Sequence, residues 1–219
     1  MALAIFDLDN TLLAGDSDYL WGRFLVEQGI VDGEIYEREN QRFYDDYKAG
    51  ELDIHDFLRF SLNPLSKHSP EKLRQWRDLF MQEKISPIIN ENAQQLVDKH
   101  RQAGDSLLII TATNSFVTTP IAKRFGIDHL IATEPETLDG QYTGEVAGVP
   151  SFREGKVSRL NEWLEEFGQN LDGSWFYSDS HNDLPLLEQV ENPVAVDPDQ
   201  TLAEIAKQRN WPIMHLHSG

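Results

Sequence analysis

The sequence predicts an α/β protein with a parallel sheet covered by helices on both faces and an all-helical segment inserted after the first strand. Short, wholly apolar runs alternate with helix-length amphipathic patterns in the first few residues and from residue 89 onwards. The segment between Gly15 and Pro87 has no strand-like run, and its aromatic and charged residues recur at helical spacing. With 219 residues, 40% of them apolar, the chain can bury the core that such a sheet requires.

The sheet elements are predicted in order from these apolar runs. The first strand is expected at residues 3–6, and further strands are expected at 106–110, 129–132, 174–178 and 193–196. Helices are expected at 89–103, 115–126, 154–168, 183–190 and 200–209. Strands that are apolar throughout indicate burial on both faces, and parallel sheets of this kind bind ligands at the carboxyl ends of their strands.

The inserted segment is predicted to hold three or four helices. Gly29, Gly50 and the Asn63-Pro64 pair are typical helix stops, and Ser69-Pro70 followed by Glu71 is a typical helix start. A smaller insert, "ETLDGQYTGE", carries an Asp139-Gly140 turn between alternating residues and predicts a β-hairpin. The predicted division is a core of residues 1–14 and 88–219 with a helical cap at 15–87.

Composition narrows the class of protein. The chain has 37 acidic and 19 basic residues, a net charge of −18, so nucleic acid and anionic membranes are not expected as partners. It has no cysteine, which excludes disulfides and thiolate sites. No apolar run approaches the ~18 residues of a membrane span, and the apolar N-terminal run is too short for a signal peptide, so a cytoplasmic protein is expected. The sequence gives no indication of oligomeric state.

The stretch "FDLDNTLL" places two aspartates directly after the first predicted strand. Asp7 and Asp9 are two residues apart on an extended segment, so their side chains point the same way. Two close carboxylates repel unless a cation or a shared proton lies between them, and Mg²⁺ prefers such hard oxygen ligands. An isolated D-x-D is equally compatible with an exposed turn.

A second acidic pair follows another predicted strand, in "SWFYSDSHNDLPLL". Asp183 alone is compatible with a helix N-cap. Asp179, however, also lies at a strand end, and the parallel topology brings it near Asp7. Four carboxylates at one edge of a sheet predict a metal site.

Two other positions are candidates for binding an anion. Thr111 ends the run "LLIITAT", with Ala112 leading into the next helix, where a hydroxyl and free backbone N–H groups can hold an anion. Lys156 lies in the first helical turn of "FREGKVSRL", where a cation opposes the helix dipole unless it has an anionic partner. Taken singly, each is compatible with an ordinary structural role.

The order of these motifs resembles the haloacid dehalogenase superfamily of phosphohydrolases. D-x-D-x-T, a strand-end Thr, a Lys at a helix start and D-x-x-N-D after a strand span essentially the whole chain. The resemblance implies a Rossmann-like core with a helical cap, in the subgroup of phosphoserine phosphatase and histidinol-phosphatase-like enzymes. One departure is that Ser178 and Ser180 stand where that subgroup usually has glycines beside the third aspartate.

The resemblance also implies residue roles. Asp7 would attack phosphorus to form an aspartyl-phosphate, and Asp9 would act as general acid and then base. Mg²⁺ would be held by the Asp7 side chain, the Asp9 backbone carbonyl and Asp179, with Asp183 in the outer shell. Thr111, Ala112, Lys156 and Asn182 would contact the transferring phosphoryl group. The acid/base Asp9 favours a phosphomonoesterase over carbon–halogen cleavage or ion pumping.

The substrate implied is a small phosphorylated metabolite that bears an amine. Asp16 matches an acidic residue that holds the substrate ammonium in phosphoserine phosphatase-like sequences, although it is equally placed to cap the first cap helix. No cap arginine aligns with a carboxylate clamp, and the acidic, aromatic cap favours L-histidinol phosphate over phosphoserine. The alternatives of another class are a Mg²⁺-binding switch domain and a non-catalytic protein that binds a basic partner.

Overall fold

The computed structural model describes residues 2–217, and over that range seven strands form one sheet in the order β4-β3-β2-β1-β5-β6-β7. All neighbouring pairs are parallel except β3 and β4, which form an antiparallel hairpin. The strands are β1 (Leu3–Phe6), β2 (Ser106–Asn114), β3 (His129–Leu138), β4 (Gln141–Ala147), β5 (Trp175–Ser178), β6 (Asn192–Val196) and β7 (Ile213–Met214). The predicted fold class is confirmed.

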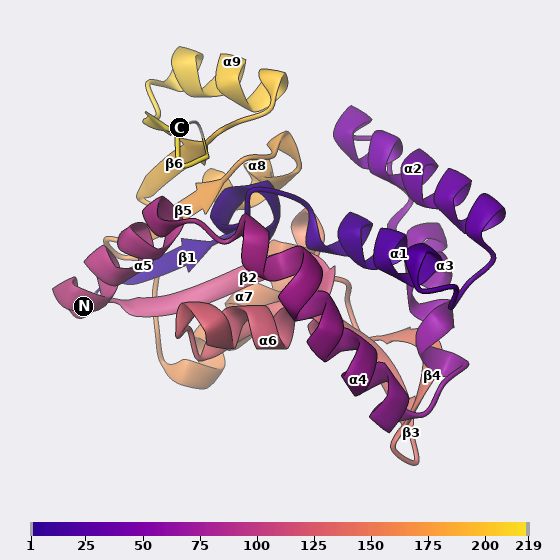
Figure 1. Ribbon diagram of the computed structural model, residues 1–219. Coiled ribbons are helices and arrows are strands. Elements are labelled where there is room, and N and C mark those ends of the chain that lie inside the picture. The colour runs from indigo at the N-terminus through magenta and orange to yellow at the C-terminus, as the bar shows by residue number, and fades with distance from the viewer. Residues whose placement is uncertain (1, 218–219) are drawn as a thin grey trace.

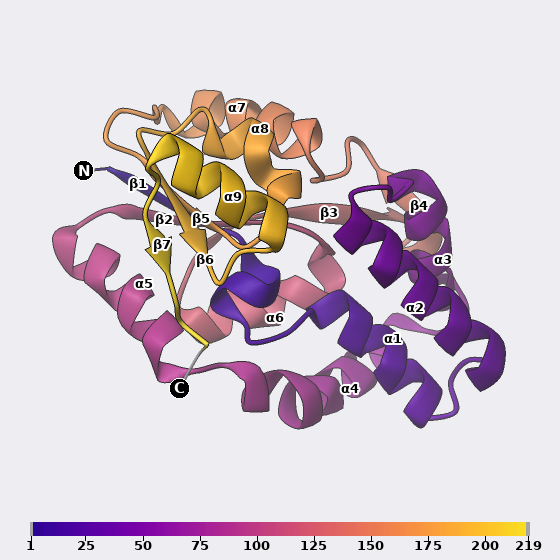
Figure 2. The same ribbon diagram turned by 90° about the horizontal axis from the view of Figure 1, so that it is seen from above.

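Helices cover both faces of this sheet (Figure 2). On one face lie α5 (Glu91–Ala103) and α6 (Ser115–Phe125), and on the other α7 (Glu154–Phe167), α8 (Leu184–Leu187) and α9 (Gln200–Arg209). Among the described residues, no helix has both the length and the apolarity needed to cross a bilayer.

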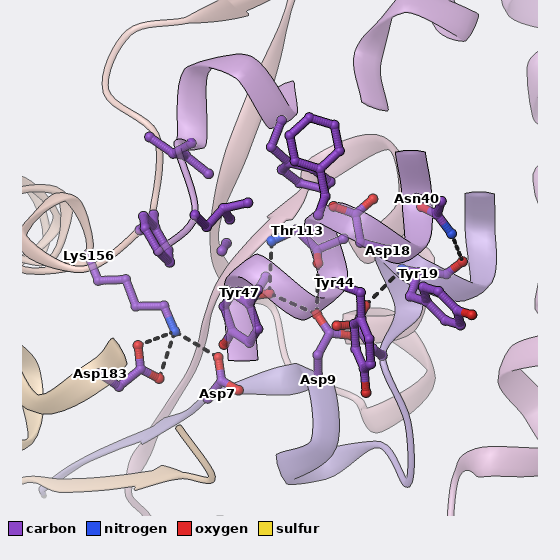
Figure 3. A pocket seen from close by; sticks show the side chains of 18 residues that line it. Asp7, Asp9, Asp18, Tyr19, Asn40, Tyr44, Tyr47, Thr113, Lys156 and Asp183 are labelled. Atoms are coloured by element: carbon purple, nitrogen blue, oxygen red, sulfur yellow. Dashed lines mark hydrogen bonds and ion pairs between the residues drawn. The ribbon is translucent and has the colours of Figure 1, made fainter. Parts of the chain in front are cut away.

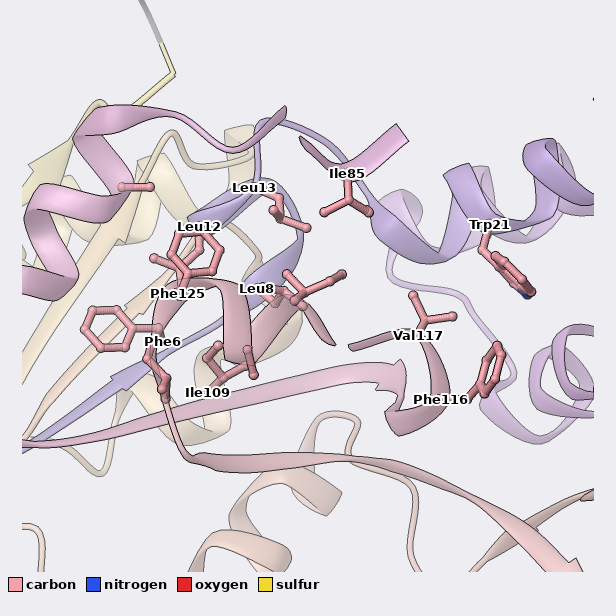
Figure 4. Close-up of a cluster of buried hydrophobic side chains, with 14 of the residues drawn as sticks. Phe6, Leu8, Leu12, Leu13, Trp21, Ile85, Ile109, Phe116, Val117 and Phe125 are labelled. Carbon is pink, nitrogen blue, oxygen red and sulfur yellow. The ribbon is translucent and has the colours of Figure 1, made fainter. Parts of the chain in front are cut away.

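The first strand shows why both faces must be covered. Ala4 and Phe6 belong to the hydrophobic cluster under α5 and α6, whereas Leu3 and Ile5 belong to the cluster under α7, α8 and α9. Successive side chains of a strand point to opposite faces, and all four of these residues are buried. Figure 4 shows Phe6 packed with Leu12 and Phe125 in the first cluster. This burial anchors the strand end from which Asp7 extends.

Four helices follow the first strand: α1 (Ser17–Glu27), α2 (Gly33–Ala49), α3 (Ile54–Ser66) and α4 (Pro70–Phe80). Figure 1 places α1, α2 and α3 beyond the carboxyl ends of the central strands. Each of these helices has an N-cap residue whose side-chain oxygen accepts a backbone N–H from the first turn. The N-cap residues are Asp16, Asp32, Asp53 and Ser69. The chain leaves α2 at Gly50, whose φ of 73° suits glycine.

Several element bounds differ from the predictions. β2 continues to Asn114, four residues beyond its predicted end at residue 110, whereas α6 begins at Ser115 as predicted. β3 runs without a break into the hairpin, whose turn lies at Asp139-Gly140 as predicted. α8 is shorter than the predicted helix at 183–190 because the chain must turn back into β6. β7 was not predicted, since two residues carry too little pattern.

A buried chain of polar groups ties α5 to the sheet and supports a stability prediction. His100 Nδ1 lies 2.8 Å from Asp105 Oδ2, and His100 Nε2 lies 2.8 Å from the Tyr177 hydroxyl. The backbone N–H of Ala2 also donates to Asp105, at 3.1 Å. Burial acts to raise the pKa of Asp105, but these hydrogen bonds outweigh it and lower that pKa.

Replacing Asp105 with asparagine is therefore expected to lower the free energy of unfolding by about 1–2 kcal/mol at pH 7. A lowered folded-state pKa stabilises the protein above the unfolded pKa, and this contribution is lost as pH falls through the folded value. The difference between the two proteins should thus shrink below pH ~4. Urea denaturation of both proteins at pH 7 and below pH ~4 measures this difference in the free energy of unfolding. The control is Asp128→Asn, at an exposed position. Equal stability at pH 7 would contradict the prediction.

Candidate active site

The carboxyl ends of β1, β2 and β5 bring the predicted motifs to one place. Asp7 directly follows β1, and its backbone N–H donates to the carbonyl of Tyr177 on β5 at 2.9 Å. Its side chain is buried, at 5% exposure. The first motif is therefore fixed by the sheet itself, because the pairing of β1 with β5 determines where Asp7 lies.

Lys156 joins two of the predicted carboxylates (Figure 3). Its Nζ lies 2.7 Å from Asp7 Oδ1 and 2.8 Å from Asp183 Oδ1. Asp183 also accepts a hydrogen bond from the Ser178 hydroxyl, at 2.7 Å. The lysine in the first turn of α7 thus has the anionic partners that its unfavourable place in the helix dipole requires.

Asp7 and Asp183 share a single cation, the ammonium of Lys156. Burial is the main cause that raises the pKa of Asp7 to about 7; Lys156 opposes the shift and Asp183 adds to it. Burial favours loss of the Lys156 proton, but Asp183 and Asp7 outweigh burial and raise the pKa of that ammonium. The lysine stays charged, and one cation faces two carboxylates.

Asp9 connects the first motif to both the sheet and the helical segment. Its Oδ1 accepts the backbone N–H of Ser17 at 2.6 Å, at the start of α1. Its Oδ2 accepts the hydroxyl of Thr113 at 2.7 Å and lies 3.4 Å from that of Thr111. These three donors hold the Asp9 carboxylate at the same strand end as Asp7.

Asp179 approaches Asp7 from the end of β5. The Thr11 hydroxyl lies 3.2 Å from both Asp7 Oδ2 and Asp179 Oδ1, and it accepts the backbone N–H of Asp179 at 3.0 Å. Burial raises the pKa of Asp179 well above its usual value, and Asp7 and Asp183 add to this shift. The predicted meeting of the two acidic pairs is therefore observed.

The donor set suits a hard divalent cation. Over residues 2–217, no three His, Asp or Glu side chains converge as a complete ligand set. The predicted site needs only the carboxylates of Asp7 and Asp179 with the Asp9 carbonyl, because Mg²⁺ keeps several of its waters. Burial is the main cause that raises the pKa values of Asp7 and Asp179, and neighbouring carboxylates add to the shift while Lys156 opposes it, so the ionised pair needs further positive charge. A divalent cation would supply that charge.

A cavity opens above Asp7 and Asp9, between the sheet and the helical segment. Asp7, Asp9, Thr111, Ala112 and Lys156 line its sheet end. Its other walls are mainly aromatic and acidic, and comprise Phe43, Tyr44, Tyr47, Phe57, Phe152, Asp16 and Asp18.

A family model for haloacid dehalogenase-like hydrolases matches residues 4–188. The chain belongs to this family. The match spans β1 through α8 and so includes every predicted site residue.

Individual relatives agree with membership of the haloacid dehalogenase-like hydrolases. A histidinol-phosphatase of Neisseria meningitidis serogroup C is 48% identical, with 98% of each chain covered. A crystal structure of a protein with unknown function from Bordetella pertussis Tohama I is also 48% identical, with 98% of each chain covered and a TM-score of 0.93. A phospho-aspartyl intermediate analogue of phosphoserine phosphatase shares the fold alone, at 19% identity and a TM-score of 0.72, covering 99% of this chain and 93% of that one. The family and the 48% identical phosphatase support the assignment of an enzyme, a phosphatase.

The two serines that depart from the haloacid dehalogenase pattern take part in the site. Ser180 keeps a negative φ of −111°, so the loop does not require glycine there. The Ser178 hydroxyl accepts the Ser180 N–H at 3.1 Å while it donates to Asp183. Ser180 in turn accepts the backbone N–H of Asn182 at 3.2 Å. The serines thus supply hydrogen bonds that glycines could not.

Asn182 and Asp179 are the predicted site residues that do not line this cavity, and Asp179 lines a neighbouring one. Asn182 instead contacts α2 and the loop before α7. Its side-chain amide donates to the carbonyl of Tyr47 at 3.1 Å, and its Oδ1 accepts from Arg153. Asp16 lines the cavity and also caps α1, because its Oδ1 accepts the N–H of Tyr19 at 2.8 Å. Burial, with the charge of Asp9 next, raises the pKa of Asp16 to about 7. Phosphate binding by Asn182 and ammonium binding by Asp16 stay predictions.

Several residues of the site were not predicted from the sequence. Among them, Thr113, Asp18 and Arg153 lie in or beside the cavity. Thr113 was missed because β2 runs farther than its apolar run. Asp18 could have been predicted, because it lies two residues after Asp16 in the acidic stretch "AGDSDYL". Arg153 carried no such signal, because only the approach of α2 to the loop before α7 gives it a partner at the site. Tyr47, one of the cap aromatics expected to be able to stack on an imidazole, does line the cavity.

Proposed function

We propose that this protein is a Mg²⁺-dependent phosphomonoesterase that hydrolyses L-histidinol phosphate through an aspartyl-phosphate at Asp7. The observation that carries the proposal is the arrangement of Asp7, Asp9 and Lys156 at the floor of a cavity with acidic and aromatic walls. The histidinol-phosphatase relative supports the same substrate. In this proposal residues 1–14 and 88–219 form the catalytic core, and 15–87 form the cap that selects the leaving group.

The reaction follows from the positions of two carboxylates. A carboxylate oxygen of Asp7 attacks phosphorus, the bond from phosphorus to the ester oxygen breaks, and Asp9 gives its proton to the departing alkoxide. Asp9 then takes a proton from a water molecule that attacks the phosphorus of the aspartyl-phosphate, which releases phosphate and restores Asp7. Lys156 stabilises charge on the phosphoryl oxygens. Mg²⁺, held by Asp7, Asp179 and the Asp9 carbonyl, would add Lewis-acid stabilisation of the same oxygens.

The far walls of the cavity favour a cationic leaving group. Asp16 and Asp18 are both half-buried, and burial is the main cause that raises the pKa of each, with neighbouring carboxylates adding to the shift. Histidinol carries an ammonium and an imidazole, which match carboxylates and aromatic faces. Phosphoserine also carries a carboxylate. Among the described residues that line the cavity, Lys156 is the only cation, and two carboxylates already occupy it. Phosphoserine is therefore the second candidate.

Release of inorganic phosphate from L-histidinol phosphate, with and without Mg²⁺, tests the proposal. We expect turnover that EDTA abolishes, and a kcat/KM well above that for O-phosphoserine. A higher kcat/KM for O-phosphoserine would reverse the choice of substrate. Mg²⁺ binding with a stable phosphorylated protein and no turnover would instead indicate a switch domain, and a folded protein that hydrolyses no ester would indicate an interaction protein.

Replacing Asp18 with asparagine should raise KM for L-histidinol phosphate about tenfold, because the cavity loses a charge that faces the cationic leaving group. The kcat/KM for p-nitrophenyl phosphate, which has no cation, should change less than about threefold. Steady-state kinetics with both esters measure the difference, and Glu37→Gln on the exposed side of α2 is the matched control. Equal losses with the two esters would remove Asp18 from substrate selection.

A further inference from the structure

Core loops hold the C-terminal end of α2 through contacts that the proposed chemistry does not use. The Arg153 guanidinium donates from Nε and Nη2 to Asn182 Oδ1, at 3.0 and 2.9 Å. The same Nη2 also donates to the carbonyl of Gly50, the residue that ends α2. Asn182 Nδ2 completes the link by donating to the carbonyl of Tyr47 at 3.1 Å.

These donors suit the end of a helix. The last carbonyls of an α-helix carry partial negative charge, which suits a guanidinium and an amide N–H. The Tyr47 carbonyl already accepts the backbone N–H of Gly50 at 3.0 Å, and the Asn182 amide donates to it as a second partner. A guanidinium only donates hydrogen bonds, so Arg153 forces Asn182 to present its oxygen to it. The amide nitrogen of Asn182 must then face Tyr47. Arg153 therefore fixes both contacts, its own and that of Asn182.

The backbone at Arg153 is strained. Its φ and ψ are 50° and −120°, in a region that residues other than glycine rarely occupy. Such strain persists only where the surroundings hold it, and it concentrates at functional sites. The strained residue lies three positions before Lys156, whose backbone N–H donates to the Arg153 carbonyl at 3.0 Å. The N-cap of the helix that carries Lys156 therefore also makes the contact to α2.

The end of α2 fits closely against the core on its other side. A Cβ atom built at Gly50 would lie 2.6 Å from Nε2 of His181, which is too close for any contact. His181 is itself held, because its Nδ1 lies 2.7 Å from Asp199 Oδ2. Gly50 is thus required both for its φ of 73° and for this approach.

The contact determines where Tyr47 lies. Tyr47 is on the last turn of α2 and lines the cavity above Asp7 as well as a second cavity beside Asp179. We propose that Arg153 is a positioning residue that holds the end of α2, and with it Tyr47, closed over the catalytic carboxylates. Where it affects turnover, this inference rests on the proposed phosphatase function.

The variant Arg153→Gly separates positioning from stability. Glycine accepts the φ and ψ of residue 153 without strain, so the melting temperature should be unchanged or higher. Loss of the guanidinium should accelerate amide hydrogen exchange in residues 43–50 of α2. KM for L-histidinol phosphate should rise on the order of tenfold or more, because only the closed fraction binds the substrate well. Arg153→Lys keeps a donor of the same charge and should recover part of both effects.

Asp139→Gly is the matched control, because Asp139 also has a positive φ, 51°, but lies in the hairpin turn. It should leave exchange in α2 and KM unchanged. The inference is overturned if Arg153→Gly keeps wild-type exchange in α2, or if it melts lower with exchange accelerated throughout the molecule, since the residue would then be merely structural. If the wild type hydrolyses no phosphate ester, the proposed function fails, while hydrogen exchange still decides the position of α2.

Discussion

Replacing Asp7 with asparagine is expected to reduce phosphate release by at least about a thousandfold, because an amide cannot form the aspartyl-phosphate. The same change should not destabilise the protein. The folded-state pKa of Asp7 is raised to about 7, so the ionised carboxylate costs stability above that pH and asparagine removes the cost. Kinetics with L-histidinol phosphate and thermal melting at pH 8 without Mg²⁺ measure the two effects.

Asp183→Asn provides the comparison for this result. It removes the other carboxylate partner of Lys156 but leaves the attacking group in place, so residual turnover should exceed that of Asp7→Asn. Activity of Asp7→Asn within tenfold of the wild type would assign the nucleophile elsewhere.

The second large effect concerns Lys156, which is 3% exposed and lies between two buried carboxylates. Replacing it with methionine leaves Asp7 and Asp183 buried without a cation. We expect the free energy of unfolding to fall by about 3–5 kcal/mol at pH 8. Phosphate release should fall at least about a hundredfold, because charge on the phosphoryl oxygens loses its stabilising ammonium.

The loss of stability in Lys156→Met should depend on pH, and the same substitution at an exposed lysine should not reproduce it. A proton can neutralise Asp7 below its raised pKa, so the destabilisation should be smaller at pH 5 than at pH 8. Denaturant titrations at the two pH values test this. Lys123→Met, on the exposed side of α6, makes the same chemical change and should alter stability by less than about 0.5 kcal/mol. Equal effects at the two lysines would show that Lys156 is not the cation that balances the site.

The fold was largely predictable because apolar runs and helical periods are local signals. β1 and β5 were predicted within a residue of their observed bounds, since each is buried on both faces. Where the outcome depended on long-range pairing, the prediction was incomplete. The strand predicted at 129–132 and the predicted hairpin around Asp139-Gly140 are in fact joined, because β3 continues to Leu138 and pairs with β4. Residues 129–132 alone do not indicate this continuation.

The acidic groups of the site were predictable for a topological reason. Strands that run parallel end at the same edge, so Asp7 and Asp179 had to approach one another once the strands were assigned. Arg153 could not be found in this way. Its role depends on α2 reaching across to the loop before α7, and the sequence of neither segment indicates the other.

The central claim is that phosphate passes through Asp7, and exchange of labelled oxygen between inorganic phosphate and water tests it most directly. Without any alcohol product, an enzyme that forms an aspartyl-phosphate can reverse its second step and exchange phosphate oxygens with water. We predict that the wild type with Mg²⁺ catalyses this exchange and that Asp7→Asn does not. Turnover of L-histidinol phosphate by the wild type without any exchange would contradict the account.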